Sequence, residues 1–182
     1  MTAGGSGRPE IRPAREDEIP IIAAIHRTGW QTGYRGMVPD QILDGVRLDD
    51  VVGDWHRRWA APPEDGHEVH VAESVGVVGF CSLRLHHSAG GPIGEVQNVH
   101  VLPEHRSLGI GAQLLTRAES RLRGRGCAEA FLWVIRDNDR AQRFYERQGW
   151  APDGAVKSEP WEWFPVVELR FRRQLEPGSD SR

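Results

Sequence analysis

The chain has 182 residues, enough for one domain with a sizeable hydrophobic core. Its net charge of -3 excludes a general electrostatic attraction to nucleic acid or to an anionic membrane surface. No apolar run approaches the ~20 residues that span a bilayer, and the first residues lack the apolar stretch of a signal peptide. Cys81 and Cys127 lie in apolar runs without metal-ligand spacing, which predicts a reduced, cytoplasmic protein.

We expect one domain over residues 10–175, between disordered tails at 1–9 and 176–182. Hydrophobic periodicity and the positions of glycine and proline indicate where the chain forms helices, strands and loops. In chain order they predict a strand at 10–14, helices at 17–30, 40–43 and 48–60, strands at 68–74 and 77–85, a loop at 86–92, a strand at 93–102, a helix at 109–123, a strand at 128–135 and a helix at 138–148. One or two strands follow, the last at 164–174.

This order predicts a mixed α/β fold. The helix at 109–123 connects the strands at 93–102 and 128–135, and such a crossover favours a parallel pair. In the first of these strands valines stand at 96, 99 and 101, so the alternation of apolar residues slips by one position. The slip predicts a β-bulge, which separates neighbouring strands. The alternative is a strand buried on both faces.

The junction between the strand at 93–102 and the following helix carries Arg106, Gly109 and Gly111. A helix N-terminus presents free backbone N–H groups and the positive end of the helix dipole, so it favours an anion. Glycine removes the Cβ atoms that would keep a phosphate away, and Arg106 can add a charge-assisted hydrogen bond. A plain tight turn is the alternative. Leu114 excludes a dinucleotide fingerprint, and no P-loop motif occurs.

Two spaced motifs resemble those of the GNAT superfamily of N-acetyltransferases. "RSLGIG" fits the pattern R/Q-x-x-G-x-G/A, and "NDRAQRFYERQGW" fits N-x-x-A-x-x-[FL]-Y-x-x-x-G-[FW]. The resemblance covers roughly residues 10–173 and is strongest over 93–150. It implies a mostly antiparallel central sheet, splayed between the fourth and fifth strands and flanked by helices.

The resemblance also implies that acetyl-CoA is the co-substrate, with its diphosphate held at the glycine turn and its pantetheine arm paired with the preceding strand. Asn138 is expected to cap its helix or to contact the pantetheine arm. The expected cofactor-binding residues are Val99, His100, Val101, Arg106, Ser107, Leu108, Gly109, Ile110, Gly111, Ala112, Asn138 and Tyr145. No metal is expected.

Acetyl transfer to an amine needs a base for the ammonium, a donor for the carbonyl oxygen and an acid for the leaving thiolate. Glu95 lies where several GNAT members carry a catalytic glutamate, and the alternative is a carboxylate facing solvent. His100 is a second candidate base. Tyr145 is the expected acid, with core packing as its alternative, and the N–H of Val101 is the expected oxyanion donor.

Aromatic residues near the expected acceptor site could hold an amine through cation–π contacts. We assign substrate binding to Trp30, Tyr34, Arg35 and Trp161, although the aromatic members could instead close the core. His67 and His70, like His86 and His87, lack acidic companions and are expected to be solvated rather than metal ligands.

The sequence therefore predicts an N-acetyltransferase that moves the acetyl group of acetyl-CoA directly to a primary amine in a ternary complex. A small-molecule amine is the first expectation for the acceptor, and the amine of a protein N-terminus or lysine is the alternative. A non-catalytic acyl-CoA-binding module is the alternative from another class. We expect no nucleic-acid or membrane partner, and the sequence leaves a homodimer open.

Overall fold

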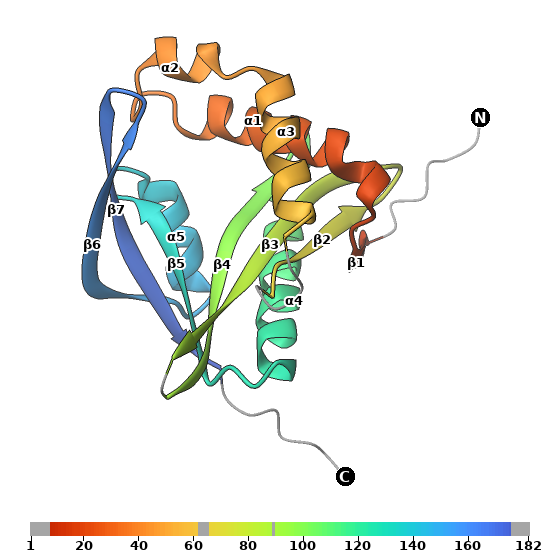
Figure 1. Cartoon of the computed structure of the whole chain (residues 1–182), viewed down its shortest axis with the longest axis vertical. Coiled ribbons are helices and arrows are strands. Elements are labelled where there is room, and N and C mark those ends of the chain that lie inside the picture. Colours follow the sequence, from red (N-terminus) through yellow and green to blue (C-terminus); the bar gives the residue numbers. More distant parts are fainter. Residues whose placement is uncertain (1–7, 62–65, 89, 176–182) are drawn as a thin grey trace.

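The computed structural model describes residues 8–61, 66–88 and 90–175 and contains one seven-stranded sheet (Figure 1). The strand order is β1-β2-β3-β4-β5-β7-β6, and β4–β5 is the parallel pair while the other neighbours are antiparallel. The predicted disordered tails fall almost wholly outside these residues. The elements are β1 (Glu10–Pro13), α1 (Ile19–Gly33), α2 (Asp40–Gly45), α3 (Leu48–Trp59), β2 (Glu68–Glu73), β3 (Val77–Ser88), β4 (Gly91–Val101), α4 (Ile110–Gly124), β5 (Glu129–Ile135), α5 (Asp139–Arg147), β6 (Ala151–Trp161) and β7 (Phe164–Gln174).

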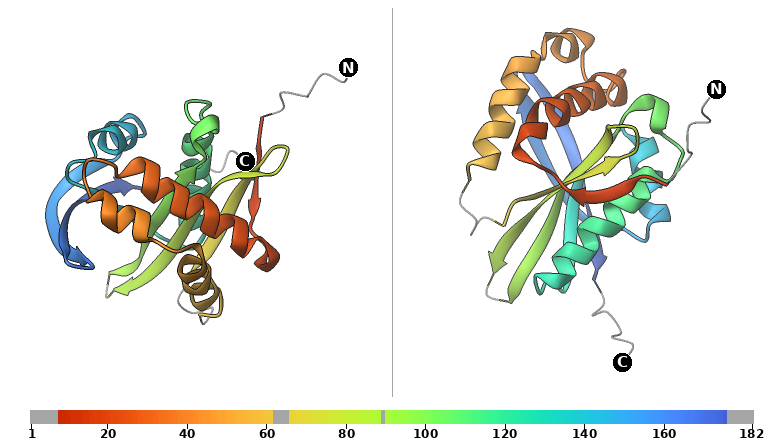
Figure 2. Two further views of the ribbon diagram at one scale, coloured as in Figure 1. Left: turned by 90° about the horizontal axis from the view of Figure 1, so that it is seen from above. Right: turned by 90° about the vertical axis from the view of Figure 1, so that its right-hand side faces the viewer.

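Helices cover both faces of the sheet (Figures 1 and 2). Leu114, Ala118 and Leu122 share one side of α4 and are fully buried against the sheet, as their spacing predicts. The other face carries α1 and α3, whose core includes Ile22 and Trp55. Within the described residues, no helix has the length and apolar character that a membrane crossing requires.

The predicted mixed fold is confirmed, and one local expectation is wrong. Residues 86–92 were expected to form a loop, but β3 continues to Ser88 and β4 begins at Gly91. Cross-strand pairing there extends the hairpin into polar residues, with His86 opposite Ile93 and His87 opposite Pro92. Strand β6 precedes β7 and is the other of the one or two strands expected after the last helix. As an edge strand it is largely exposed, so it lacks the apolar alternation that would have placed it.

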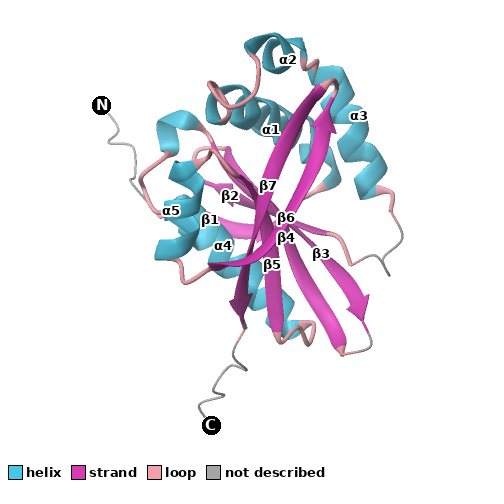
Figure 3. Ribbon diagram, turned by 90° about the vertical axis from the view of Figure 1, so that its left-hand side faces the viewer, coloured by secondary structure: helices cyan, strands magenta, loops and turns pink. Residues whose placement is uncertain are grey.

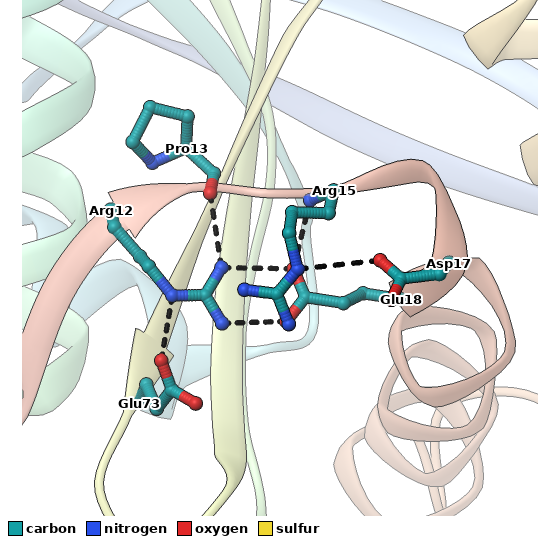
Figure 4. A network of polar contacts seen from close by, with 6 residues as sticks. All are labelled: Arg12, Pro13, Arg15, Asp17, Glu18 and Glu73. Atoms are coloured by element: carbon teal, nitrogen blue, oxygen red, sulfur yellow. Dashed lines mark hydrogen bonds and ion pairs between the residues drawn. The ribbon is translucent and has the colours of Figure 1, made fainter.

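An ionic network fixes the N-terminal strand to the start of α1 (Figure 4). Both guanidinium Nη atoms of Arg12 donate to the carboxylate of Glu18, at 2.9 and 2.6 Å, while its Nε donates to Glu73 at 2.6 Å. The backbone N–H of Arg15 donates to the same carboxylate at 2.8 Å. The hydrogen bonds from Arg12, and then the one from Arg15, hold the pKa of the Glu18 carboxyl below its usual value, although burial alone would raise it. They thereby position α1, whose C-terminal half borders the candidate site.

The predicted β-bulge lies in β4. Ser82 pairs with Asn98 and Leu83 with Val96, which leaves Gln97 as the extra residue. Beyond the bulge β4 separates from β5: only Gly94 and Glu95 have partners in β5, although both strands continue. The divergence is plain in Figure 1, and Figure 3 shows the same strands from the side of β6 and β7. It leaves one edge of β4 without a neighbouring strand.

Candidate active site

The turn that precedes α4 exposes backbone donors. Gly109 has φ +77° and is the N-cap residue, and Ser107 has φ +64°, a left-handed conformation that is uncommon outside glycine. No side chain caps the helix, and Gln113 donates the first hydrogen bond, to the carbonyl of Gly109. The N–H groups from Ile110 to Ala112 therefore have no acceptor within the helix and are available to an anion.

The open edge of β4 supplies a second set of backbone donors. The N–H of Leu102 donates to the carbonyl of Val78 in β3 at 2.9 Å. Successive N–H groups of a strand point to opposite edges, so those of Val99 and Val101 point away from β3, into the gap beside β5. The carbonyl of Val101 lies on the same edge and accepts from Nε of Arg106 at 3.2 Å.

These two sets of donors face one pocket of about 460 Å³. It brings together Tyr34 and most of the residues that were expected to bind the cofactor. From the expected site it contains Tyr34, Val99, His100, Val101, Arg106, Ser107, Gly109, Ile110, Gly111, Ala112, Asn138 and Tyr145. Leu108 is largely exposed and lines a neighbouring groove instead. Trp30, Arg35, Glu95 and Trp161 are not among the lining residues.

The pocket is electropositive. Arg106, Arg140 and Arg147 line it, and none of the described lining residues is acidic. Burial and the nearby charge of Arg140 lower the pKa of Arg106, while Glu104, which does not line the pocket, opposes them. Nη2 of Arg106 also donates to Thr32 in α1 at 2.8 Å. Such an arrangement favours a ligand of high negative charge.

Tyr145 lines the pocket from α5. Its ring packs near Phe144, Trp150 and Phe171, with centroids 5.0, 6.5 and 6.5 Å away. Burial raises the pKa of its phenol, so the hydroxyl is protonated at neutral pH. The ring therefore packs in the core and the residue also borders the pocket, while its role as the acid stays a prediction. Asn138 is the N-cap of α5, and its Oδ1 accepts from the N–H of Ala141 at 3.0 Å.

Glu95 lies on β4 just before the bulge. A Cβ on the preceding Gly94 would meet Leu122 of α4. Because successive side chains of a strand point to opposite faces, Glu95 points to the face away from α4. It borders the pocket through Gln97, a lining residue whose Nε2 lies 3.4 Å from Oε2 of Glu95. The same oxygen lies 2.8 Å from Nε2 of His86. The side chain of Glu95 is 16% exposed, so its carboxylate is largely sheltered from solvent.

The expectation of solvated histidines is wrong for His67 and His70. His70 is buried, and burial lowers the pKa of each of these imidazoles to about 4. His100 has a pKa of about 4 for the same reason, so it is neutral near pH 7 and too weak a base to hold the ammonium proton. Among the described residues, no group of three or more His, Cys, Asp or Glu side chains is arranged to hold a metal ion.

The aromatic residues assigned to the acceptor contact one another. Trp161, at the end of β6, lies 5.3 Å from the ring of Trp30 and 5.6 Å from that of Tyr34. Of the three only Tyr34 lines the pocket, and burial raises its pKa to about 12. Arg35 does not line the pocket and instead forms ion pairs with Asp40, at 3.0 Å, and with Asp44. The trio mainly closes the space between α1 and the β6–β7 hairpin.

Several lining residues were missed by the sequence analysis. Arg140 and Arg147 lie on α5, two turns apart, and their place beside the motif residues could have indicated one face. Gln97 enters the pocket because it is the bulged residue, and the slip in the valine pattern was the available signal. Gly29 and Gly33 come from α1, and no local pattern places this helix against β4.

Comparison with known proteins identifies the family. A model described as the acetyltransferase (GNAT) family matches residues 30–150. The chain belongs to the GNAT acetyltransferase family. The identification of an acetyl-CoA-dependent N-acetyltransferase from its two motifs is thereby confirmed.

Relatives and solved structures agree with this assignment. An uncharacterized N-acetyltransferase of Archaeoglobus fulgidus is 46% identical over 143 residues, which cover 76% of this chain and 90% of the relative. A mycothiol acetyltransferase of Nocardiopsis dassonvillei is 30% identical over 152 residues, covering 79% of this chain but 46% of the relative. The crystal structure of PaiA N-acetyltransferase from Thermoplasma acidophilum in complex with coenzyme A has the same fold, with a TM-score of 0.70, 18% identity and coverage of 92% and 99%.

Proposed function

We propose that this GNAT protein transfers the acetyl group of acetyl-CoA directly to the primary amine of a small molecule, with both substrates bound at once. One observation carries the proposal. A single pocket connects the N–H groups at the start of α4, the open edge of β4 and the residue Tyr145. The diphosphate, the amide-bearing arm and the thioester sulfur occur in the same order along acetyl-CoA.

The residues of the pocket fit acetyl-CoA. Gly109 is required by its positive φ, but a Cβ on Gly111 would meet only ordinary contacts, the nearest being Phe144 at 3.5 Å. The protein itself therefore does not demand glycine at 111, whereas a diphosphate lying against the helix start does. Arg106 and Arg140 supply charge for its oxygens. The N–H groups of Val99 and Val101 are placed to pair with the amides of the pantetheine arm.

Direct transfer is supported by the state of the two cysteines. Cys81 is fully buried, its Sγ donates to the carbonyl of Leu114 at 3.4 Å, and burial raises its pKa to about 12. Cys127 is buried as well, and burial raises its pKa. Neither lines the pocket, so neither is placed to carry the acetyl group as a thiolate nucleophile.

Glu95, Val101 and Tyr145 are assigned the chemical roles. Acetyl-CoA supplies a thioester whose carbonyl carbon is open to attack by an amine. Glu95 removes the proton that keeps the acceptor amine from acting as a nucleophile. The N–H of Val101 donates to the acetyl oxygen as negative charge develops there. Tyr145 donates its proton to the departing sulfur: the same dry surroundings that raise the phenol's pKa also raise that of a thiol, as Cys81 illustrates.

A small acceptor is favoured over a protein side chain by the closure around the site. Contacts of Trp161 with Trp30 and Tyr34 join α1 to the β6–β7 hairpin and narrow the approach from that side. Several relatives are named mycothiol acetyltransferases, a name that refers to a low-molecular-weight compound. An acceptor that must pass between these elements needs a small cross-section near its amine.

The test is an assay of free thiol release from acetyl-CoA with three groups of acceptors: small amines such as tyramine, spermidine and glucosamine; peptides with a free N-terminus; and lysine peptides with a blocked N-terminus. The proposal expects the highest kcat/KM among the small amines. Faster turnover of either peptide group would overturn the choice of acceptor. Tight binding of acetyl-CoA by calorimetry, without thiol release from any acceptor, would favour a non-catalytic binding module.

A further inference from the structure

His86 and Glu95 form a hydrogen-bonded pair next to the pocket. Nε2 of His86, on β3, lies 2.8 Å from Oε2 of Glu95, on β4. The imidazole also packs beside Phe131 of β5, with ring centroids 5.4 Å apart. Within the described part of the chain, no hydrogen bond is made by Oε1 of Glu95. One carboxylate oxygen thus faces a histidine and the other is available to a substrate.

The proposed reaction releases a proton. At neutral pH the acceptor is an ammonium and the product thiol is mostly protonated, so R–NH₃⁺ and acetyl-CoA yield the N-acetyl amide, CoA thiol and one H⁺. Of the two protons that the nitrogen loses, one ends on the sulfur and the other must reach bulk solvent. If Glu95 receives that proton, it has to lose it before the next turnover.

We propose that His86 is the proton outlet of Glu95, an inference that rests on the proposed function. The proton moves from Oε2 of the protonated Glu95 to Nε2 of an imidazole whose own proton is on Nδ1, and the imidazolium then loses a proton to water. The side chain of His86 is 43% exposed, against 16% for Glu95. The histidine therefore connects a sheltered carboxylate to solvent.

Arginine side chains lie near the pair on three sides. Burial lowers the pKa of Arg58 on α3, and Glu95 is close enough for its carboxylate to oppose this shift. Arg170 on β7 lies over the ring of Phe131, at 5.8 Å, on which His86 also packs, and Arg84 is the cross-strand neighbour of Glu95. Three guanidinium groups therefore lie near the pair, and that of Arg170 is itself paired with Asp153 at 2.8 Å.

The test compares substitutions at His86 with the same substitutions at His87, using acetyl-CoA and the amine with the highest turnover. His87 is the next residue of the exposed hairpin, and its side chain points to the opposite face. We expect His86→Gln and His86→Ala to lower kcat by ~10-fold or more with little change in KM for acetyl-CoA. His87→Gln and His87→Ala should stay at the wild-type rate. Added imidazole should restore His86→Ala but not Glu95→Gln.

His86→Gln separates a proton outlet from a merely structural partner. A glutamine amide can still donate to Oε2 of Glu95, but it cannot carry a proton at neutral pH. Full activity of His86→Gln would therefore overturn the proposal, as would the absence of any response of His86→Ala to imidazole.

A readout without turnover keeps the inference separate from the proposed function. In ¹⁵N-labelled protein, Glu95→Gln should shift the ring nitrogen resonances of His86 and leave those of His87 in place. Unchanged His86 resonances would overturn the pairing and the outlet together, whatever the enzyme does. Shifted resonances in a protein that turns over none of the acceptors would instead contradict the proposed function, and with it the outlet.

Discussion

His100 lies directly against the backbone of Gly29. A Cβ built on Gly29 would lie 2.2 Å from Nδ1 of His100 and 2.9 Å from Cε1, closer than real atoms approach. The contact joins α1 to β4 immediately beside the candidate site, and both residues line its pocket. Glycine at this position in the helix therefore lets α1 approach the open strand closely enough to form one wall of the pocket.

Gly29→Ala should lower the free energy of unfolding by ~1–3 kcal/mol, because the imidazole or the helix must move. Urea denaturation measures the change. In the double variant Gly29→Ala, His100→Ala, space becomes available and the added cost of the methyl group should largely disappear. If Gly29→Ala lowered the free energy of unfolding equally in the wild-type protein and in the His100→Ala variant, the contact between the two residues would be contradicted.

Tyr145→Phe should lower kcat by ~10²–10⁴-fold, because the phenol is assigned the proton that the departing sulfur receives. The ring contacts with Trp150 and Phe171 do not need the hydroxyl, so the melting temperature and the calorimetric affinity for coenzyme A should change little. Turnover at the wild-type rate would remove Tyr145 from the chemistry while leaving the fold intact.

Acidification from about pH 7 to 5 should destabilise the protein. His67, His70 and His100 have folded-state pKa values of about 4, below the ordinary value of 6.5. Between these values the unfolded chain binds more protons than the folded one, so stability is full above about 6.5 and falls as the pH drops toward 4. Each histidine contributes up to ~1.4 kcal/mol per pH unit.

Urea denaturation at several pH values measures this slope. His67→Gln should reduce it, since one imidazole with a lowered pKa is removed. The corresponding change at the exposed His87 should leave it unaltered. A free energy of unfolding that is constant from pH 7 to 5 would show that these imidazoles charge as easily in the folded protein as in the unfolded chain.

Trp150→Phe should destabilise the packing of α4 against the end of α5. Nε1 of Trp150 donates to Oε1 of the buried Glu119 at 2.9 Å, and Arg173 lies 3.1 Å from the same oxygen. Without the indole donor the carboxylate loses a buried hydrogen bond, at a cost of ~1–3 kcal/mol. Trp163→Phe is the matched control, since Trp163 is 64% exposed, and equal effects of the two variants would contradict the prediction.

Local patterns in the sequence determined much of the fold and part of the site. The glycine turn, the helix cap at Asn138 and the bulge in β4 were readable because each depends on residues within a few positions of one another. Leu114, Ala118 and Leu122 marked the buried side of α4 for the same reason. The GNAT motifs then predicted a ligand for the turn.

Tertiary structure alone decided which distant residues meet. Gly29 faces His100, and Glu95 pairs with His86, because the sheet and the covering helix bring separate segments together. The trio of Trp30, Tyr34 and Trp161 became mainly a closure for the same reason. Periodicity reports which face of an element is apolar, but the partner across that face is chosen by packing of the whole chain, so no local pattern contains it.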